Sequence, residues 1–233
     1  MNQKLVFWTA LNSYQSFKLL RDKPLSTTHP VQTEEWTARR IELFRRFTLP
    51  SILNQRYEDW LFVVLLDPAL RHLTDPFLVP RHPDDRVIYC YEDGPALERL
   101  RQYDQVVMTL IDGDDMYSED AGQMIMDCPD EWMYFRLGYA LDVPTGRLWA
   151  YDTIGTGPFW ARRIDPKTIS RLDRDKRHPT HKAIINHGPT ELPADQFCVT
   201  LHDINTSSHT HMRYVLQGQP RDIKILERFG GGG

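Results

Sequence analysis

Four short, largely apolar segments, separated by longer polar stretches, set the pattern of the first half of the chain. They cover residues 5–11, 60–66, 86–91 and 105–111. Because they are continuously apolar rather than alternating, they are typical of strands buried on both faces of a sheet. Such strands occur in parallel sheets that are covered by helices on both faces. The pattern therefore predicts an α/β fold with a mostly parallel central sheet.

Helical patterns occupy the stretches between these segments. Thr33 is expected to be the N-cap of the first helix, and Pro50 is expected to break or restart it. A short helix with a proline at its start is predicted over 95–103, and Ser118 is expected to cap a helix that runs to about Cys128. The residues that recur at helical spacing after Thr33 are Trp36, Arg40, Leu43, Phe44 and Phe47.

Three of the four predicted strands end in acidic residues. Asp67 follows the second strand, the pair Glu92–Asp93 follows the third, and an Asp-Gly-Asp-Asp sequence at 112–115 follows the fourth. Ligands of parallel sheets bind outside the carboxyl ends of the strands, so these side chains are expected at one edge. Carboxylates are ligands for Mg²⁺ or Mn²⁺. An Asp-rich turn that bonds its own backbone is the alternative reading of 112–115.

After Glu131 the pattern becomes that of antiparallel strands. Residues 132–141 and 148–154, on either side of a Pro-Thr-Gly turn, predict a hairpin. Further strands are expected over 159–164 and 197–201. The second half is therefore expected to form an antiparallel C-terminal part that shapes the acceptor side of a site.

Composition is that of an ordinary soluble globular protein, with 41% hydrophobic and 26% charged residues among 233. We expect a single domain over 1–229, with a nucleotide-binding half (1–127) and an acceptor-side half (128–229). The terminal glycines, 230–233, are expected to be a flexible tail. The net charge of −4 gives no electrostatic case for binding nucleic acid.

The three cysteines are far apart and lack any Cys-x-x-Cys spacing. They argue against a disulfide framework and against a zinc site, and they are expected to be reduced thiols of a cytoplasmic protein. The apolar run at 5–11 is too short for a signal peptide or a membrane span. Any contact with a membrane is therefore expected to be peripheral.

Four segments resemble, in order, the family 2 glycosyltransferases of the GT-A fold. They are residues 47–55 (FTLPSILNQ), 60–67 (WLFVVLLD), 92–99 (EDGPALER) and 110–115 (LIDGDD). Order and spacing agree over roughly residues 4–127. With Arg40 and Trp60 included, the arrangement is most similar to a bacterial branch of rhamnosyltransferases.

The resemblance implies a nucleotide-diphospho-sugar donor, a divalent cation (Mn²⁺ or Mg²⁺), and inverting transfer to a hydroxyl of a glycan or polysaccharide precursor. It implies that Asp67 contacts the base and that Asp112 lies near the ribose or the metal. Asp114 corresponds to the carboxylate that coordinates the metal on the diphosphate, and Asp115 to an auxiliary ligand. A metal there would stabilise the charge on the leaving nucleoside diphosphate.

Four further residues enter through the same resemblance. Asp93 and Arg99 belong to the turn and helix before the metal strand, and we expect them to bind the donor. Family 2 enzymes commonly use an Asp, often within Glu-Asp, as the catalytic base; no Glu-Asp follows residue 120, and Asp195 is the nearest analogue. His202 is expected as a further ligand of the metal or contact of the diphosphate.

Weaker candidates complete the set. Asp152 is a second candidate base, and His209 or His211 could take the role of His202. A basic loop could close over a diphosphate, although a solvated loop is the simpler reading; its residues are Arg171, Arg174, Lys176, Arg177, His178, His181 and Lys182. Aromatic residues that could stack on sugars, with core packing as their default role, are Trp149, Tyr151, Phe159 and Trp160.

Two other functions are compatible with the same residues. A metal-dependent nucleotidyl or phosphoryl transferase would use the same acidic strand ends, but such enzymes often have a Gly-rich loop after the first strand, which residues 12–15 (NSYQ) are not. A non-catalytic carbohydrate-binding protein with a decayed site would explain the missing Glu-Asp. Mn²⁺-dependent binding of nucleotides would support either of the two enzyme functions, and its absence would favour the binding protein.

Overall fold

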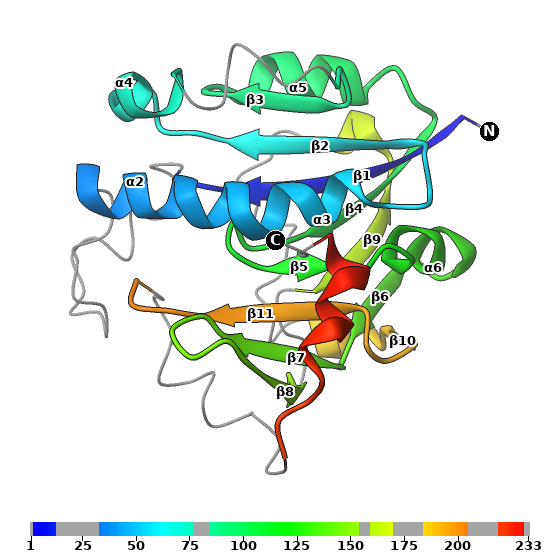
Figure 1. The fold of residues 1–233 in the computed structure, drawn as a ribbon. Helices are drawn as coiled ribbons and strands as arrows, with labels where there is room; N and C mark the ends of the chain where they lie inside the picture. Colours follow the sequence, from blue (N-terminus) through cyan, green and yellow to red (C-terminus); the bar gives the residue numbers. More distant parts are fainter. Residues whose placement is uncertain are drawn as a thin grey trace.

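The chain forms two β-sheets with helices packed around them (Figure 1). The computed structural model describes residues 2–12, 33–76, 84–153, 159–169, 184–204 and 219–230. Within these ranges the larger sheet has seven strands in the order β10-β6-β9-β4-β1-β2-β3, and the smaller has four in the order β5-β11-β7-β8.

The four segments predicted as buried strands form one side of the large sheet. β1 (Gln3–Ala10) lies in the middle of this group, with β2 (Trp60–Leu65) and then β3 (Val87–Cys90) on one flank. β4 (Gln105–Leu110) lies on the other flank. All neighbouring pairs in this group are parallel. Their carboxyl ends therefore point to one edge of the sheet.

The second half of the chain completes the large sheet. β9 (Trp160–Ile164) is antiparallel to β4, and β6 (Trp132–Phe135) is antiparallel to β9. β10 (Thr190–Leu192) pairs with β6 in parallel. Among the described strands of the large sheet, β9 alone runs against the others, and the prediction of an α/β fold with a mostly parallel central sheet is confirmed.

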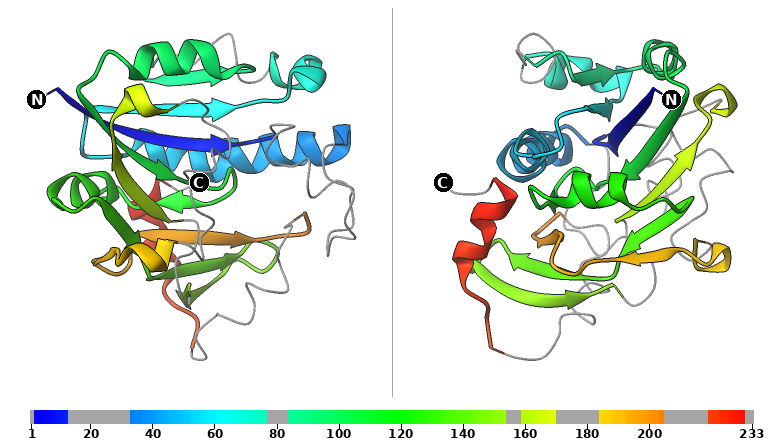
Figure 2. Two further views of the ribbon diagram at one scale, coloured as in Figure 1. Left: turned by 180° about the vertical axis from the view of Figure 1, so that it is seen from behind. Right: turned by 90° about the vertical axis from the view of Figure 1, so that its right-hand side faces the viewer.

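Helices cover both faces of this sheet, as predicted. Phe7 of β1 packs into the core that includes α2 (Glu34–Leu43), whereas its neighbour Trp8 packs into the core that includes α5 (Asp93–Leu100). The two helices lie on opposite sides of the sheet in the side view of Figure 2. Successive side chains of a strand point to opposite faces, so a continuously apolar strand is what such a sheet requires.

The first helix begins where its cap was predicted. The Thr33 side chain accepts the backbone N–H of Trp36 at 3.2 Å, and acidic residues occupy the first turn. This contact satisfies one of the donors that a helix leaves unpaired at its start.

Pro50 changes the winding of this helix rather than ending it. α2 continues as the π-helical turn η1 (Phe44–Thr48) and then as α3 (Leu49–Leu53). At the junction the N–H of Leu49 bonds the carbonyl of Phe44, five residues back. A proline cannot donate the usual bond, and a π-turn is one way in which a helix absorbs that loss.

The smaller sheet contains the predicted hairpin. β7 (Leu137–Asp142) and β8 (Arg147–Asp152) pair antiparallel around the turn at Gly146. β11 (Phe197–Leu201) joins β7 in parallel, and β5 (Met116–Tyr117) pairs antiparallel with β11. The strand pair β5–β11 thus brings the segment after residue 115 against residues 197–198.

The segment predicted as the first strand of the hairpin is divided between the two sheets. β6 ends at Phe135 in the large sheet, and β7 starts at Leu137 in the small one. Both parts are apolar, so the pattern alone did not show where the chain changes sheets. Gly138 lies just after the change, where a Cβ atom would come within 2.5 Å of the backbone oxygen of Phe197.

The prediction that Ser118 caps the next helix is wrong. α6 (Ala121–Asp127) has Asp120 at its N-cap position. The Ser118 hydroxyl instead donates to the side-chain oxygen of Gln196 beside β11. The Ser118 hydroxyl is therefore bonded to a residue 78 positions away in the chain and is not used as a local helix cap.

Shorter elements complete the described part of the chain. η5 (Ile223–Phe229) packs Leu226 and Phe229 onto the small sheet, in front of it in Figure 1. The other short helices are η2 (Pro68–Leu70), α4 (Arg71–Thr74), η3 (Pro166–Thr168) and η4 (Ile185–His187).

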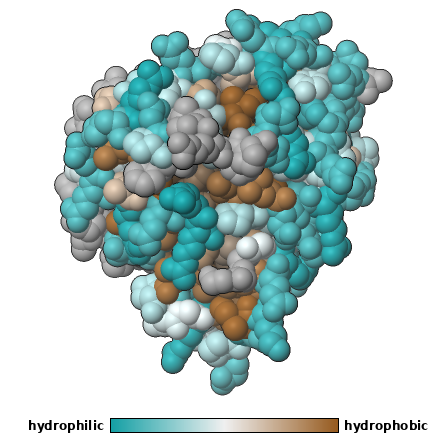
Figure 3. Space-filling view, turned by 45° about the horizontal axis from the view of Figure 1, so that its top comes forward, coloured by the Kyte–Doolittle hydropathy of each residue, from teal (hydrophilic) through white to brown (hydrophobic). Residues whose placement is uncertain are grey.

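Hydrophilic side chains predominate on the face shown in Figure 3, with hydrophobic residues in recesses between them. Ile223 is the one large hydrophobic side chain that is exposed within the described ranges. Among the same residues, no helix has the length and apolar character needed to cross a membrane.

Candidate functional site

The acidic strand ends lie along one edge of the large sheet, as predicted. The register pairs Ala10 with Leu65 and Leu65 with Cys90, so the ends of β1, β2 and β3 are level. β4 ends beside β1 on the other flank. The acidic residues that follow these strands, which we call the acidic edge, are Asp67, Glu92, Asp93 and Asp112.

Asp67 is a buried cap at this edge. Its carboxylate accepts the N–H of Ala69 at 2.9 Å and so begins η2, and its own N–H donates to the Asn12 side-chain oxygen at 3.0 Å. Asp67 as a whole residue is 4% exposed. These contacts join the ends of β1 and β2 and hold the carboxylate in a fixed position.

Asp93 and Arg99, both expected to bind the donor, are at opposite ends of α5. Asp93 lies in the first turn, beside the end of β3, and Arg99 lies in the last turn. Six residues of helix separate them by about 9 Å along the axis. The structure therefore brings Asp93 to the acidic edge and leaves Arg99 away from it.

The turn from Asp112 to Asp115 is held by its backbone. The Asp112 carbonyl accepts the N–H of Asp115 at 3.0 Å and the Thr48 hydroxyl at 3.4 Å. A Cβ at Gly113 would lie 2.9 Å from the end of the Leu11 side chain and 3.1 Å from Nη2 of Arg40, so glycine leaves room for both side chains. The Asp112 side chain is exposed, whereas those of Asp114 and Asp115 are buried.

Asp114 is the centre of a buried charged cluster, the Arg40–Asp114–His202 cluster. Its Oδ2 atom is 2.5 Å from Nη1 of Arg40 and 2.7 Å from Nε2 of His202. The side chain of Arg40 is 8% exposed, that of Asp114 is 5% exposed, and that of His202 is 1% exposed. Burial raises the pKa of Asp114, but Arg40 and His202 outweigh it and hold that pKa well below its usual value.

Asp115 is held instead by contacts with β11. Its carboxylate accepts the N–H of Thr200 at 2.9 Å, and the Thr200 hydroxyl donates to the Asp114 carbonyl at 2.8 Å. Burial first, and then the charges of Asp114 and Asp112, raise the pKa of Asp115 well above its usual value. These bonds join the turn to the end of β11.

The three residues predicted as metal ligands are close together, but they do not fit a divalent cation in this arrangement. Oδ2 of Asp114 already accepts from Arg40, whose positive charge is permanent and opposes a second cation. Asp115 is turned to the backbone of Thr200. In the described part of the chain, no group of three or more His, Cys, Asp or Glu side chains is arranged to hold a metal ion.

The candidate bases lie elsewhere. Asp195 is an exposed residue at φ +67° in the turn before β11, whereas His202 follows that strand. β11 lies between the two, and its five extended residues span about 17 Å. Asp152, on β8, pairs with Arg136 at 3.1 Å. Neither carboxylate is brought to the acidic edge.

Most of the aromatic candidates for sugar stacking serve the core. Tyr151, Phe159 and Trp160 are buried, and Phe159 stacks on Phe197 with ring centroids 4.1 Å apart. Trp149 is half-buried on β8. Tyr151, Phe159 and Trp160 therefore have the default role of packing in the core.

The remaining candidates cannot be placed. His209, His211 and the basic loop of residues 171–182 lie outside the described residues.

Sequence reasoning missed Arg40 as a site residue, although the signal was present. Arg40 falls at helical spacing between Trp36 and Phe44, so it occupies the buried side of α2. A charged residue on the buried side of a helix requires a buried partner. The aspartates of the turn at 112–115 were the available anions, and Asp114 is that partner.

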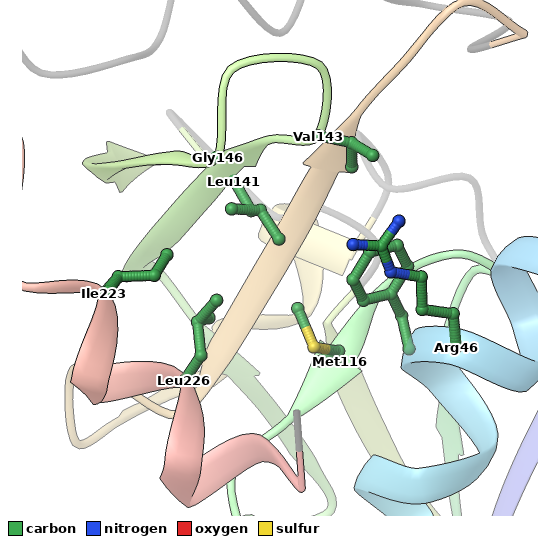
Figure 4. Close-up of a pocket in the computed structure, with 8 residues that line it drawn as sticks. Arg46, Met116, Leu141, Val143, Gly146, Ile223 and Leu226 are labelled. Carbon is green, nitrogen blue, oxygen red and sulfur yellow. The ribbon is translucent and has the colours of Figure 1, made fainter. Parts of the chain in front are cut away.

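A separate cavity of about 260 Å³ lies between the small sheet, η5 and η1. Figure 4 shows Met116, Leu141 and Leu226 directed into it, with Arg46 at its side. Its lining contains no acidic residue. It is therefore distinct in chemistry from the acidic edge.

No protein-family model and no curated protein matches the sequence. The solved structures it resembles include a 4-diphosphocytidyl-2C-methyl-D-erythritol synthase from Anaerococcus prevotii, at 11% identity and a TM-score of 0.39, with 91% of this chain and 93% of that chain covered. S. aureus TarS 1-349 is 11% identical with a TM-score of 0.37, and the match covers 86% of this chain and 60% of that chain. The inositol-1-phosphate CTP transferase from T. maritima is 14% identical with a TM-score of 0.35, and 97% of each chain is covered. The fold class rests on the strand order and directions given above.

Proposed function

We propose that the protein is a glycosyltransferase of the GT-A fold that binds a nucleotide-diphospho-sugar at the acidic edge. The observation that supports this function is the common edge of four parallel strands, where Asp67, Asp93 and Asp112 follow β2, β3 and β4. The carboxyl ends of such strands are where open α/β sheets bind ligands. The chain order of these aspartates is that of the family 2 resemblance.

In this proposal Asp67 contacts the base of the nucleotide and Asp112 lies near its ribose and diphosphate. The rigid cap at Asp67 and the exposure of Asp112 suit these two roles. Residues 1–127 then supply most of the donor side and residues 128–229 most of the acceptor side. Three cysteines without disulfide partners are compatible with the cytoplasmic location included in the proposal.

The reaction breaks the bond between the sugar C1 and the diphosphate oxygen and forms a bond to an acceptor hydroxyl oxygen. The hydroxyl proton passes to a base, and the nucleoside diphosphate leaves; inversion at C1 and rhamnose as the sugar are the finer expectations. Asp195 lies before β11, at the opposite end of that strand from His202. The proposal therefore assigns deprotonation to another group of the acceptor side.

A product assay with candidate donors tests the function. The protein is incubated with UDP-, GDP-, CDP- and dTDP-sugars and an acceptor panel, with and without Mn²⁺, and the released nucleotide is identified. Release of a nucleoside diphosphate that is lost in Asp112→Asn supports a glycosyltransferase. The matched control is Asp203→Asn, an exposed carboxylate that follows β11, which should retain activity.

The other functions give different results in the same assay. Pyrophosphate formed from a nucleoside triphosphate and a sugar phosphate would indicate a nucleotidyltransferase and overturn the proposal. Nucleotide binding without any product would favour the non-catalytic alternative.

A further inference from the structure

The Arg40–Asp114–His202 cluster joins three distant parts of the chain. Arg40 comes from the last turn of α2, Asp114 from the turn after β4, and His202 from just after β11. Each side chain is at most 8% exposed. All three meet at one carboxylate oxygen, Oδ2 of Asp114.

The charge at this oxygen is already balanced. A guanidinium keeps its proton at any pH a protein tolerates, so Arg40 brings one full positive charge to 2.5 Å from the carboxylate. His202 adds a second hydrogen-bonding partner at 2.7 Å. A divalent cation would add two more positive charges beside Arg40 at a desolvated site, where like charges repel strongly.

Packing keeps Arg40 in this position. Nη2 of Arg40 lies 3.1 Å from where a Cβ of Gly113 would be, so the absence of a side chain at Gly113 makes room for the guanidinium. On another side Arg40 lies over the Trp36 ring, with Cζ 5.4 Å from its centroid. A cation that displaced Arg40 would have to move a buried, stacked side chain.

We infer that the Arg40 guanidinium takes the place of the divalent cation at Asp114, so that Asp114, Asp115 and His202 do not form a metal site in the folded protein. The inference rests on the proposed function only for the expectation that a cation belongs at this position. Asp114 then acts as the anchor of Arg40 and of the turn that carries Asp112. Removing the guanidinium should uncover a carboxylate and an imidazole that can bind Mn²⁺ together.

Titration with Mn²⁺ alone, followed by the electron paramagnetic resonance signal of the free ion, tests the inference without any nucleotide. We expect wild type to have no Mn²⁺ site at Asp114, so Asp114→Asn should bind Mn²⁺ no less than wild type does. We expect Arg40→Met to bind Mn²⁺ at least about tenfold more tightly than wild type, and the double variant Arg40→Met/Asp114→Asn to lose this gain. Arg39→Met is the matched control, because Arg39 is the residue before Arg40 in α2 and pairs with Glu42 at the surface.

Two results would overturn the inference. One is Mn²⁺ binding by wild type that Asp114→Asn abolishes and Asp112→Asn leaves intact. The other is an Arg40→Met variant that folds, as judged by circular dichroism, and gains no affinity for Mn²⁺. If Arg40→Met does not fold, the comparison of Mn²⁺ binding by wild type with Mn²⁺ binding by Asp114→Asn decides the outcome. Arg40→Lys keeps a positive charge at this position. Because no nucleotide is present, failure of the proposed glycosyltransferase activity leaves each of these results readable.

Discussion

Asp114 and Asp115 are neighbours in the chain, yet their carboxyl groups meet different surroundings. Asp114 has Arg40 and His202 against one oxygen, and its pKa is lowered despite burial. Burial, and then the negative charges of Asp114 and Asp112, raise the pKa of Asp115, and the N–H of Thr200 only partly offsets them. Paired carboxyl groups whose pKa values move apart make different contributions to stability.

Replacing Asp114 should be costly, because it leaves the Arg40 charge buried without an anion. We expect Asp114→Asn to lower the free energy of unfolding by about 3 kcal/mol. Asp112→Asn, two residues earlier but exposed, should change it by less than about 0.5 kcal/mol. Urea denaturation at pH 7 measures both; equal losses would show that the charge on Asp114 does not stabilise the fold.

The two aspartates should also respond to pH with opposite signs. The lowered pKa of Asp114 gives stability that is present above about pH 4 and lost as the pH falls further toward the folded-state value, so the cost of Asp114→Asn should shrink toward pH 3. The raised pKa of Asp115 gives stability that is present below about pH 4 and lost as the pH rises through the folded value.

Asp115→Asn should therefore be at least as stable as wild type at pH 8 and lose that advantage at pH 4. The amide oxygen can still accept the N–H of Thr200. Denaturation curves at several pH values between 3 and 8 test both signs. A loss of stability in Asp115→Asn that grows as the pH rises would contradict the raised pKa.

At the scale of elements, the change from β6 to β7 depends on how closely β7 approaches β11. Gly138 lies where a Cβ would come within 2.5 Å of the Phe197 backbone oxygen and 2.8 Å of its ring. A backbone atom cannot rotate away as a side chain can. The glycine therefore sets the spacing at which the small sheet forms.

Gly138→Ala should destabilise the protein by about 1–3 kcal/mol through this overlap. Gly94→Ala is the control: Gly94 lies in the first turn of α5 with nothing within 4 Å of its missing Cβ. Because Pro95 follows it and disfavours a helical alanine there, the change should stay within about 0.5 kcal/mol. Thermal unfolding of both variants provides the comparison. A neutral Gly138→Ala would mean that β7 and β11 can separate at little cost.

The elements that the sequence predicted correctly are those whose pattern is local. Apolar runs specified β1, β2 and β4 within a residue or two, and Thr33 identified the start of α2. Ser118 and the division at Arg136 were missed because partners distant in the chain decide them.

The same division holds for the site. The acidic edge followed from strand ends, which are local features. That Arg40 reaches Asp114, and that Asp195 lies a strand's length from His202, depend on how the two sheets assemble, and spacing along the chain does not encode this. A charge on the buried side of α2 was the one local hint.

At the scale of the molecule, the two parts of the chain, residues 1–127 and 128–229, are interleaved in both sheets. β9, from the second half, pairs with β4 in the large sheet, and β5, from the first half, pairs with β11 in the small one. Neither sheet is complete with one half of the chain. The boundary near residue 127 that we predicted therefore does not divide the fold.

Residues 1–127 expressed alone should fail to unfold cooperatively, because β4 would become an open edge and β5 would lack its partner. The full chain, under the same buffer, should show a single cooperative transition. Circular dichroism during urea denaturation distinguishes them. A sharp transition in the fragment would show that the parallel strands are sufficient for folding.

The long reach of the Arg40–Asp114–His202 cluster has a consequence for synthesis of the protein. His202 lies 88 residues after Asp114, so it leaves the ribosome well after its partner. Contacts between residues this far apart form late and slow the folding of a domain. Until then the guanidinium and the carboxylate can pair without the imidazole that closes the cluster. A nascent chain that stalls before residue 202 would carry every aspartate of the acidic edge and still lack the third member of the cluster that anchors the turn bearing Asp112.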